Sequence, residues 1–266
     1  MAPAARNARQ LVLAEIGPAG QARLAAARVL VVGCGGLGAP VISSLAAAGV
    51  GHLTLVDDDT VEPSNLNRQV LFTEADVGRR KAEVAAERAR QLGGAVEVIA
   101  RTERLAPGGA RAAVRGCSLV VDCADGLPTK FLLNDACVRE DVPLVHGAAT
   151  AWSGQVLVVP GRRGPCLRCL FEGPPPPGAL PTCRTAGILG AVTGVAGSFQ
   201  AAEAVKLLVG NANVLAGRLL AVDVLTPSVR AVAFPRRTDC PACGDAPTVD
   251  ATNPSDYQVD AACDDP

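Results

Sequence analysis

A glycine-rich turn between an apolar strand and a helix constrains this chain more than any other feature of its sequence. RVLVVG at 28–33 reads as a short buried strand, and GCGGLG occupies positions 33–38. Glycine lets the backbone turn tightly and approach a phosphate, and the N-terminus of the following helix favours negative charge. The turn predicts nucleotide binding, with a tight turn that binds nothing as the alternative. The candidate nucleotide-binding glycines are Gly33, Gly35, Gly36 and Gly38.

An acidic residue follows the turn at a distance typical of nucleotide sites. Asp57 ends the next predicted strand, 19 residues after Gly38. In dinucleotide-binding folds a carboxylate near this distance meets the ribose hydroxyls. The turn and its acidic partner predict a nucleotide but do not distinguish NAD from ATP.

Strands and helices alternate along the first 150 residues. This alternation predicts an α/β fold with a Rossmann-like, doubly wound and mainly parallel sheet, covered by helices on both faces. The later pattern predicts a C-terminal antiparallel extension, and Gly17-Pro18 is read as the stop signal of the first helix. The expected strands are 28–33, 52–57, 96–100, 118–122, 143–147, 155–160, 219–225 and 229–234, and the expected helices are 5–16, 37–48, 75–92, 108–115, 127–140 and 186–209.

Charge separates a body from a tail. Residues 244–266 hold six Asp and no Lys or Arg, so the rest of the chain carries 25 cations against 20 anions. The net charge of −1 does not favour nucleic-acid binding, which is typical of strongly basic chains. We expect one domain over 1–244, with a nucleotide-binding half of about 1–150 and a second half of about 151–244. Residues 245–266 are predicted to be a disordered acidic tail, and deleting 248–266 is expected to leave activity intact.

Two uncharged runs are interpreted as core rather than as membrane spans. Residues 29–56 contain six Gly and read as strand, turn, helix and strand, while 185–202 reaches only the lower limit of a spanning helix. Residues 1–28 carry four Arg and no long apolar block, which argues against a secretory signal. We expect a cytoplasmic protein without a membrane partner, whose cysteines serve metal binding, catalysis or packing.

The residues after Asp57 favour ATP over NAD. Positions 57–69 read DDDTVEPSNLNRQ, and a triphosphate needs cations to neutralise it when phosphorus is attacked. Arg68 and Lys81 are the candidate cations. Lys81 either points into a site or snorkels to solvent, as Arg88 is expected to do. The sequence contains far fewer lysines than arginines, so a lysine is not its usual cation. This favours a role for Lys81 in the site. Lys81 shares an expected apolar helical stripe, whose members are Val77, Val84, Ala85 and Leu92.

Two aspartates follow a predicted strand at the sheet edge where ligands bind in open α/β folds. Asp122 and Asp125 belong to the segment DCAD at 122–125. A carboxylate beside phosphates indicates Mg²⁺, which takes one or two carboxylates together with phosphate oxygens. The alternative for Asp125 is a side-chain cap for the helix at 127–140.

The ten cysteines include two Cys-x-x-Cys pairs, at 166–169 and 240–243. Together the pairs predict a closed tetrahedral zinc site with four thiolates, and a redox dithiol is the alternative. Cys183 is expected to precede the long helix directly, beside Arg184. It is either a nucleophile with a lowered pKa or an unreactive loop thiol. The cysteines expected to serve packing are Cys34, Cys117, Cys123 and Cys137, and Cys263 is unassigned.

Taken together, these motifs resemble the ThiF/MoeB/HesA family, the bacterial relatives of ubiquitin-activating enzymes. The resemblance covers about residues 6–244, and several independent motifs occur in the family's order. They are RNARQ (6–10), GCGGLG (33–38), DDDTVEPSNLNRQ (57–69), VGRRK (77–81), DCAD (122–125), the two cysteine pairs and TCRTAGILG (182–190).

The resemblance implies a reaction and its partners. Members of the family use Mg-ATP to adenylate the C-terminal glycine of a small ubiquitin-like sulfur carrier that ends in Gly-Gly. The carboxylate attacks the α-phosphorus, and pyrophosphate leaves. A homodimer is implied, and a separate sulfur donor is expected because no rhodanese domain follows the zinc motif. Thiamine, molybdenum-cofactor, cysteine and secondary-metabolite pathways all use this enzyme class.

The resemblance also implies roles for single residues. Arg9 matches an arginine that the family supplies from the partner subunit, and Cys183 matches a cysteine that in some members bonds covalently with the carrier. The implied ATP contacts are the glycine-rich turn, Asp57 on the ribose, and Ser64, Asn65, Arg68 and Lys81 along the phosphates. Asp125 is implied to hold Mg²⁺. The implied Zn²⁺ ligands are Cys166, Cys169, Cys240 and Cys243.

One departure from the family pattern touches the site, because Gly126 follows Asp125 where the family usually has Asn. Two other functions remain as alternatives. The chain is either a non-catalytic member that binds nucleotide or a partner, or an NAD-dependent oxidoreductase. For the oxidoreductase, His146 is the one plausible proton-transfer histidine.

Overall fold

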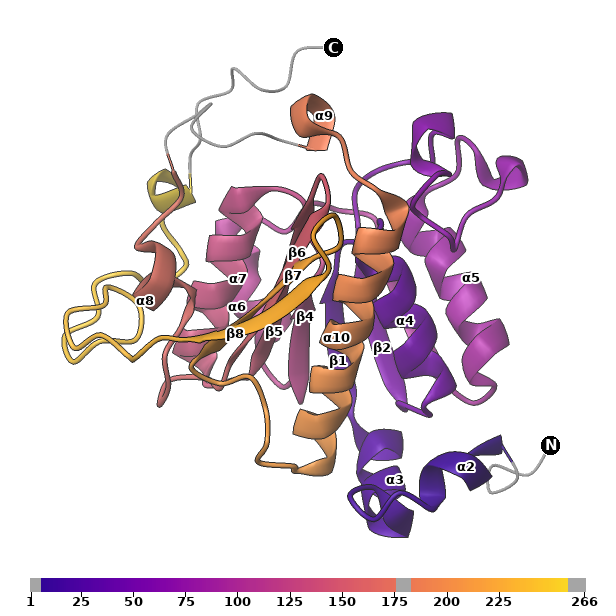
Figure 1. Cartoon of the computed structure of the whole chain (residues 1–266), viewed down its shortest axis with the longest axis horizontal. Helices are drawn as coiled ribbons and strands as arrows, with labels where there is room; N and C mark the ends of the chain where they lie inside the picture. Colours follow the sequence, from indigo (N-terminus) through magenta and orange to yellow (C-terminus); the bar gives the residue numbers. More distant parts are fainter. Residues whose placement is uncertain (1–5, 176–182, 258–266) are drawn as a thin grey trace.

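The computed structural model describes residues 6–175 and 183–257, which contain one eight-stranded sheet (Figure 1). The strand order is β3-β2-β1-β4-β5-β6-β7-β8. Strands from β3 to β5 pair in parallel, and those from β5 to β8 pair antiparallel, which confirms the predicted fold class. The strands are β1 (Arg28–Val32), β2 (His52–Val56), β3 (Glu97–Arg101), β4 (Leu119–Asp122), β5 (Leu144–Thr150), β6 (Ser153–Val159), β7 (Arg218–Asp223) and β8 (Ser228–Ala233).

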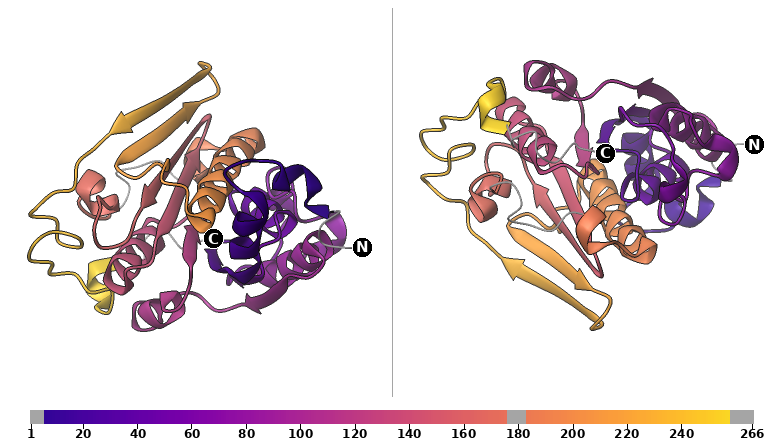
Figure 2. Two further views of the ribbon diagram at one scale, coloured as in Figure 1. Left: turned by 90° about the horizontal axis from the view of Figure 1, so that it is seen from below. Right: turned by 90° about the horizontal axis from the view of Figure 1, so that it is seen from above.

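Helices cover both faces of the sheet (Figure 2). α3, α4, α5 and α10 bury their apolar side chains against one face, and α6, α7 and α8 against the other. The helices are α2 (Ala8–Leu11), α3 (Gly17–Ala26), α4 (Gly38–Ala47), α5 (Lys81–Gly93), α6 (Pro107–Val114), α7 (Leu127–Glu140), α8 (Leu167–Phe171), α9 (Cys183–Ala186) and α10 (Gly190–Val209), with 3₁₀ turns η1 (Pro63–Asn65), η2 (Glu74–Asp76) and η3 (Pro254–Tyr257).

β1 shows why the central strands read as continuous apolar runs. Val29 and Val31 pack into the core on the α4 side, while Leu30 and Val32 pack into the core on the α7 side. Successive side chains of a strand point to opposite faces, so a strand covered on both sides needs apolar residues at every position. The core is aliphatic because the helices supply mainly Ala, Val and Leu.

The carboxyl ends of the central strands meet at one edge of the sheet. Val32 of β1 is in register with Val56 of β2 and with Asp122 of β4, and Asp122 is in register with His146 of β5. The strand order reverses between β1 and β4, which is the switch point where open α/β sheets bind ligands. The glycine-rich turn, the loop after β2 and the loop after β4 therefore begin side by side.

The N-terminal helix differs from its prediction. Within the described part of the expected helix 5–16 the structure has the short α2, and Gly17-Pro18 begins α3 instead of ending a helix. Proline is tolerated in the first turn of a helix because its missing N–H needs no partner there. The interpretation of Gly17-Pro18 as a stop signal is therefore wrong.

Two other helices begin later than expected. α5 starts at Lys81, because η2 and a positive φ of 87° at Gly78 interrupt the chain before it. The expected stripe is only partly correct: Val84 and Ala85 are buried, whereas Val77 and Leu92 are exposed. α10 starts at Gly190, because Gly187 has φ of 71° and separates it from α9. The expected loop 161–183 also contains α8.

No helix in the part of the chain that the structure describes is both long and apolar enough to cross a membrane. Run 29–56 forms β1, α4 and β2, as expected. Run 185–202 contributes to α10, which packs against α4, β5 and β6.

Part of the acidic tail is packed rather than disordered. The backbone carbonyl of Val249 accepts a hydrogen bond from Arg139 Nε at 2.8 Å, and Ala251 is fully buried. Tyr257 is 6% exposed, and its hydroxyl donates to Asp135 Oδ2 at 2.7 Å. The prediction of a disordered tail is therefore wrong for residues 245–257, and 258–266 lie outside the described residues. Deleting 248–266 would remove these contacts with α7.

We expect Tyr257→Phe to lower the free energy of unfolding by about 1–2 kcal/mol, because a hydrogen bond to a buried carboxylate is lost. Urea unfolding followed by far-UV circular dichroism measures the change. Ser255→Ala is the matched control, since Ser255 is exposed on the same turn. Equal stability of the Tyr257→Phe protein and the wild type would show that the 245–257 segment does not stabilise the domain.

Candidate functional site

A cavity of about 330 Å³ opens at the carboxyl edge of the sheet, beside the start of α5. Four of the predicted site residues line it together: Asn65, Arg68, Lys81 and Asp125. The other residues around it are Asp58, Asp59, Thr60, Glu62, Gln69 and Arg80. The cavity therefore combines cations with carboxylates, which suits a ligand that carries phosphates and a divalent cation.

Lys81 points toward this cavity and not into solvent. It is the first residue of α5, its residue exposure is 6%, and its Nζ lies 2.8 Å from Asp59 Oδ2. The N-terminal end of α5 adds the positive end of a helix dipole at the same place. Between the two alternatives for Lys81, the geometry favours the site.

Arg88 does not snorkel as expected. Its Nη2 lies 3.1 Å from Asp76 Oδ2, and Asp76 is 2% exposed. Thr73 donates two hydrogen bonds to the same carboxylate. The guanidinium is therefore anchored to a buried carboxylate that also holds η2.

The loop 57–69 folds back on itself beside the cavity. η1 carries a reciprocal cap between Glu62 and Asn65, which buries Asn65. Arg68 Nη1 donates to the backbone carbonyl of Ser64 at 2.8 Å. Ser64 is exposed, its hydroxyl donates to Glu62 Oε2 at 3.2 Å, and it is not among the cavity-lining residues. The loop thus sets Arg68 beside the cavity while the Ser64 hydroxyl faces Glu62.

Several residues at the cavity were missed in the sequence. Asp59 partners Lys81, and Arg80 Nη1 donates to the carbonyl of Asp58 at 2.6 Å. Gln69 is 5% exposed, and among the described residues its Oε1 has no hydrogen-bond partner. The signal was the polar segment 57–69, which marks the region but not which side chains face inward.

The glycine-rich turn packs too tightly for side chains. A Cβ on Gly33, whose φ is 94°, would lie 2.4 Å from the carbonyl oxygen of Cys123, and a Cβ on Gly38 would lie 2.2 Å from that of Gly33. Near Gly36 and Gly35 such an atom would lie 3.0 Å and 3.3 Å from the nearest side-chain atoms. Close backbone approach therefore explains Gly33 and Gly38 without a ligand, and the turn still presents the N-terminus of α4.

Asp57 joins the two loops of the site. Its Oδ2 accepts a hydrogen bond from the Cys34 backbone N–H at 2.7 Å, and its Oδ1 accepts one from the Asp59 backbone N–H at 2.9 Å. Burial raises the pKa of Asp57, while these two donors oppose the shift. The carboxylate lies between the glycine-rich turn and the loop 57–69, outside the set that lines the cavity.

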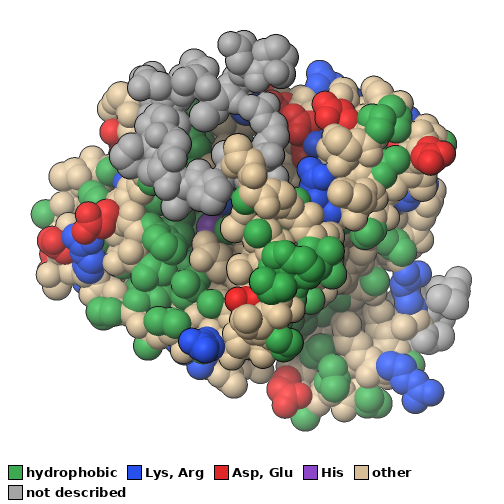
Figure 3. Space-filling view, turned by 45° about the horizontal axis from the view of Figure 1, so that its top comes forward, with side chains coloured by type: hydrophobic (Ala, Val, Ile, Leu, Met, Phe, Trp, Pro, Cys, Tyr) green, Lys and Arg blue, Asp and Glu red, His purple; other side chains and the backbone are tan. Residues whose placement is uncertain are grey.

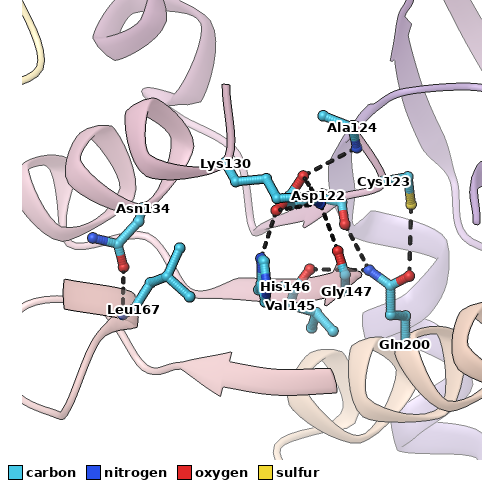
Figure 4. Close-up of polar contacts among 10 residues, drawn as sticks. All are labelled: Asp122, Cys123, Ala124, Lys130, Asn134, Val145, His146, Gly147, Leu167 and Gln200. Atoms are coloured by element: carbon cyan, nitrogen blue, oxygen red, sulfur yellow. Dashed lines mark hydrogen bonds and ion pairs between the residues drawn. The ribbon is translucent and has the colours of Figure 1, made fainter. Parts of the chain in front are cut away.

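The two aspartates after β4 have different surroundings. Asp125 is exposed at the cavity, and within the described part of the chain its carboxylate makes no hydrogen bond or ion pair. The N-cap of α7 is Gly126, without a side-chain cap, so Asp125 does not have the capping role. Asp122 is fully buried and contacts His146 and Lys130 (Figure 4), and it is not among the residues that line the cavity.

Two predicted residues are not brought to this cavity. Arg9 is exposed on α2, and the adjacent Gln10 donates to the carbonyl of Ala48, at the end of α4 opposite the glycine-rich turn. Cys183 begins the four-residue α9 and does not precede the long helix directly, contrary to expectation. Its side chain lies outside the described residues.

The four predicted zinc ligands form one cluster. Their Sγ atoms all lie within 4.8 Å of one another, with 3.6 Å between Cys166 and Cys240 and 3.3 Å between Cys169 and Cys243. Thiolates around a tetrahedral Zn²⁺, at about 2.3 Å each, lie about 3.8 Å apart. The cluster therefore fits zinc, and four cysteines leave no coordination position open for a substrate. The Arg237 backbone N–H donates to Cys169 Sγ at 3.4 Å.

α7 holds the cysteine-bearing helix α8 through buried polar contacts. Asn134 Oδ1 accepts the Leu167 backbone N–H at 2.8 Å, and Asp135 pairs with Arg168, with Nη2 2.8 Å from Oδ2. The Arg168 guanidinium lies 5.2 Å from the centre of the Phe131 ring. Because Cys240 and Cys243 belong to the segment after β8, the cluster joins that segment to α8.

The cysteines expected to serve packing do so. Cys34, Cys123 and Cys137 are buried, and burial raises the pKa of each thiol. Cys117 is half-buried against α6, and its pKa is also raised by burial. Cys263 lies outside the described residues.

Comparison with known proteins gives consistent relatives. The model of the ThiF family matches residues 7–242. The sulfur carrier protein adenylyltransferase of Thermus thermophilus is 49% identical over 248 residues, which cover 91% of this chain and 92% of that protein. The SAMP-activating enzyme E1 of Haloferax volcanii is 47% identical, covering 95% and 93%.

Other relatives are longer or more distant. The adenylyltransferase and sulfurtransferase MOCS3 of Mus musculus is 49% identical over 96% of this chain, which spans 55% of that protein. A crystal structure of E. coli MccB with ATP has a TM-score of 0.74 at 23% identity and covers 85% of this chain and 69% of that one. The MccB likeness is one of fold.

Proposed function

The chain belongs to the ThiF family, and we propose that it uses Mg-ATP to adenylate the C-terminal glycine of a small ubiquitin-like sulfur carrier protein. The observation that carries this proposal is the cavity that Arg68, Lys81 and Asp125 line together. The relatives that match nearly their whole length are named as a sulfur carrier protein adenylyltransferase and a SAMP-activating enzyme. ATP use follows from the family.

The residues divide the chemistry of this reaction among them. The carrier carboxylate attacks the α-phosphorus of ATP, the bond to the β-phosphate oxygen breaks, and pyrophosphate leaves. Arg68 and Lys81 stabilise the negative charge that develops on the phosphate oxygens. Asp57 holds the glycine-rich turn in place and is available to the ribose from that position.

Magnesium fits the free carboxylate of Asp125. Asp125 is exposed at the cavity and has no partner among the described residues, as a carboxylate that binds a cation at a phosphate site requires. Bound Mg²⁺ would reduce the charge of the triphosphate. Gly126 in place of the usual Asn removes one polar side chain next to Asp125 but leaves its carboxylate.

Zinc has a structural role in this proposal. Four thiolates saturate a tetrahedral Zn²⁺, so the metal would hold the segment after β8 against α8 and take no part in adenylation. The domain boundary that we propose, 1–244, ends just after this cluster, although residues 245–257 also pack on α7.

The partners extend beyond the single chain. We propose a homodimer in which Arg9 reaches the site of the other subunit, since α2 lies far from the cavity of its own chain. Sulfur would come from a separate donor protein. Cys183 is proposed as the cysteine that bonds with the carrier.

The proposal is tested by ATP–pyrophosphate exchange with purified protein. Exchange should appear with a Gly-Gly-ended carrier and be absent when its final glycine is deleted. A ThiS-like and a MoaD-like carrier assayed in parallel identify the pathway. ATP binding without exchange with any carrier would instead support a non-catalytic member, and tight binding of NAD with none of ATP would support the oxidoreductase.

A further inference from the structure

A buried polar cluster of Asp122, Lys130, His146 and Gln200 follows the central strands (Figure 4), and none of these four residues lines the proposed nucleotide cavity. Asp122 is fully buried at the end of β4, and its Oδ2 lies 2.7 Å from Nδ1 of His146 on β5. Lys130 of α7 places its Nζ 3.4 Å from both oxygens of that carboxylate and donates to the carbonyl of Gly147 at 2.6 Å. Gln200 of α10 donates to the Asp122 backbone carbonyl at 2.7 Å.

The cluster fixes the state of the His146 ring. Burial raises the pKa of Asp122, but Lys130 and His146 outweigh it and hold this pKa below its ordinary value, so the carboxylate is ionised and accepts a hydrogen bond from Nδ1–H. Burial also lowers the pKa of His146, which keeps the ring neutral. A neutral ring that carries its proton on Nδ1 presents a lone pair on Nε2.

The structure shows no hydrogen-bond donor for His146 Nε2 among the described residues. His146 is 2% exposed, and this nitrogen is buried. A buried polar atom left unpaired costs free energy that a bound donor would recover. Most buried side-chain polar atoms in proteins have a hydrogen-bond partner. The unpaired Nε2 therefore indicates that a ligand or a water molecule binds there.

A second cavity provides the space for such a ligand. It has a volume of about 150 Å³ and is lined by His146 together with mostly apolar side chains, among them Leu127, Phe131, Leu167 and Phe171. On the face shown in Figure 3, hydrophobic side chains gather beside a hollow in which histidine is visible. Among the residues that the structure describes, none lines both this cavity and the proposed nucleotide cavity.

We propose that this second cavity binds a small molecule that combines an apolar, ring-sized body with one O–H or N–H donor, and that His146 Nε2 accepts the hydrogen bond. The apolar walls from α7 and α8 hold the body of the ligand. An apolar cavity of about 150 Å³ is large enough for a benzene ring. Gln155, which also lines the cavity, supplies a second polar group.

This site is independent of adenylation in both place and test. Its polar anchor comes from β5, whereas the nucleotide cavity is built from the loops after β2 and β4 and from α5. Binding can be measured without ATP or carrier. A failure of this proposal and a failure of the proposed enzyme activity are therefore distinguishable.

The experiment uses the full chain labelled with ¹⁵N-histidine, which contains only His52 and His146. Phenol is the probe, and benzene is the matched molecule without a donor. Phenol should move the His146 Nε2 resonance toward the range of a hydrogen-bonded nitrogen and should bind about tenfold more tightly than benzene. His52, whose Nδ1 lies 2.8 Å from Glu97 Oε2 and which does not line this cavity, should not respond.

Two variants locate the binding. His146→Leu should remove the preference for phenol over benzene. His146→Leu also removes a hydrogen-bond partner of the buried Asp122 and can therefore destabilise the fold. For this reason a second variant, Ala148→Leu, keeps all residues of the polar cluster and fills the cavity, so it should abolish binding of both probes. Ala231→Leu on β8 is the matched control and should bind phenol like the wild type, since Ala231 is exposed and is not among the residues that line the cavity.

Three results would overturn the proposal. The first is equal affinity for phenol and benzene in the wild type. The second is an unchanged His146 resonance at saturating phenol, which would mean that water alone occupies the site. The third is binding that survives Ala148→Leu, because the probe would then lie elsewhere.

Discussion

Replacing Lys81 with methionine is expected to lower carrier-dependent ATP–pyrophosphate exchange by about 100- to 1,000-fold. Methionine keeps an unbranched side chain in the space of the lysine stem, so the change removes mainly the ammonium group. The partner Asp59 is largely exposed, at 60% of its side chain, and loses little when left unpaired. The loss should therefore appear in the rate of exchange and not in the melting temperature.

The chain offers a close control for this change. Lys206→Met also removes an ion-paired lysine, but Lys206 pairs with Glu203 on α10 and does not line the cavity. It should keep exchange within about twofold of the wild type. Arg68→Ala and Asp125→Ala should each reduce exchange as strongly as Lys81→Met. Wild-type exchange in both of these variants would refute the proposed site.

Cys240→Ser is expected to remove bound zinc and to lower the melting temperature by roughly 10 °C, which corresponds to about 4 kcal/mol for a domain of this size. Cys240 is 1% exposed and lies 3.6 Å from Cys166, so its loss breaks the link between α8 and the segment after β8. Metal content by elemental analysis and unfolding by calorimetry measure the two effects.

Cys117→Ser is the matched control for the zinc prediction. Cys117 is half-buried, with its Sγ near the carbonyl of Ala113, and it lies outside the four-cysteine cluster. It should retain one zinc per chain and a melting temperature within a few degrees of the wild type. Full zinc content in the Cys240→Ser protein, or zinc loss in Cys117→Ser, would contradict the assignment of ligands.

Local patterns in the sequence were sufficient for the central fold. The strand 28–32, the turn at 33–38 and the helix from Gly38 follow one another with few alternatives, since each is determined by residues close in the chain. The predicted α7, 127–140, agrees with the structure at both ends. The two cysteine pairs meet as expected, although 70 residues separate them. They could be matched from the sequence because all four thiolates are ligands that one zinc ion can bind.

Predictions failed where a backbone detail or a distant partner decided the outcome. Gly187 takes a positive φ, which ends α9 before α10 begins, and a helical pattern that spans the position does not reveal it. The tail looked disordered because its composition is acidic and polar. It packs nevertheless, since Tyr257 finds the buried carboxylate of Asp135 on α7, and composition alone does not reveal such a partner.

The sequence by itself determined the order of the eight strands along the chain, the glycine-rich turn, the four thiolates and the family of the chain. These depend on periodicity and on motifs that are contiguous or have the same ligand chemistry. Only the tertiary structure decided which charged side chains meet. Lys81 finds Asp59, and His146 finds Asp122 while its Nε2 faces an apolar cavity. The physical reason is that burial and pairing depend on strand register and helix packing, which bring together residues far apart in the chain.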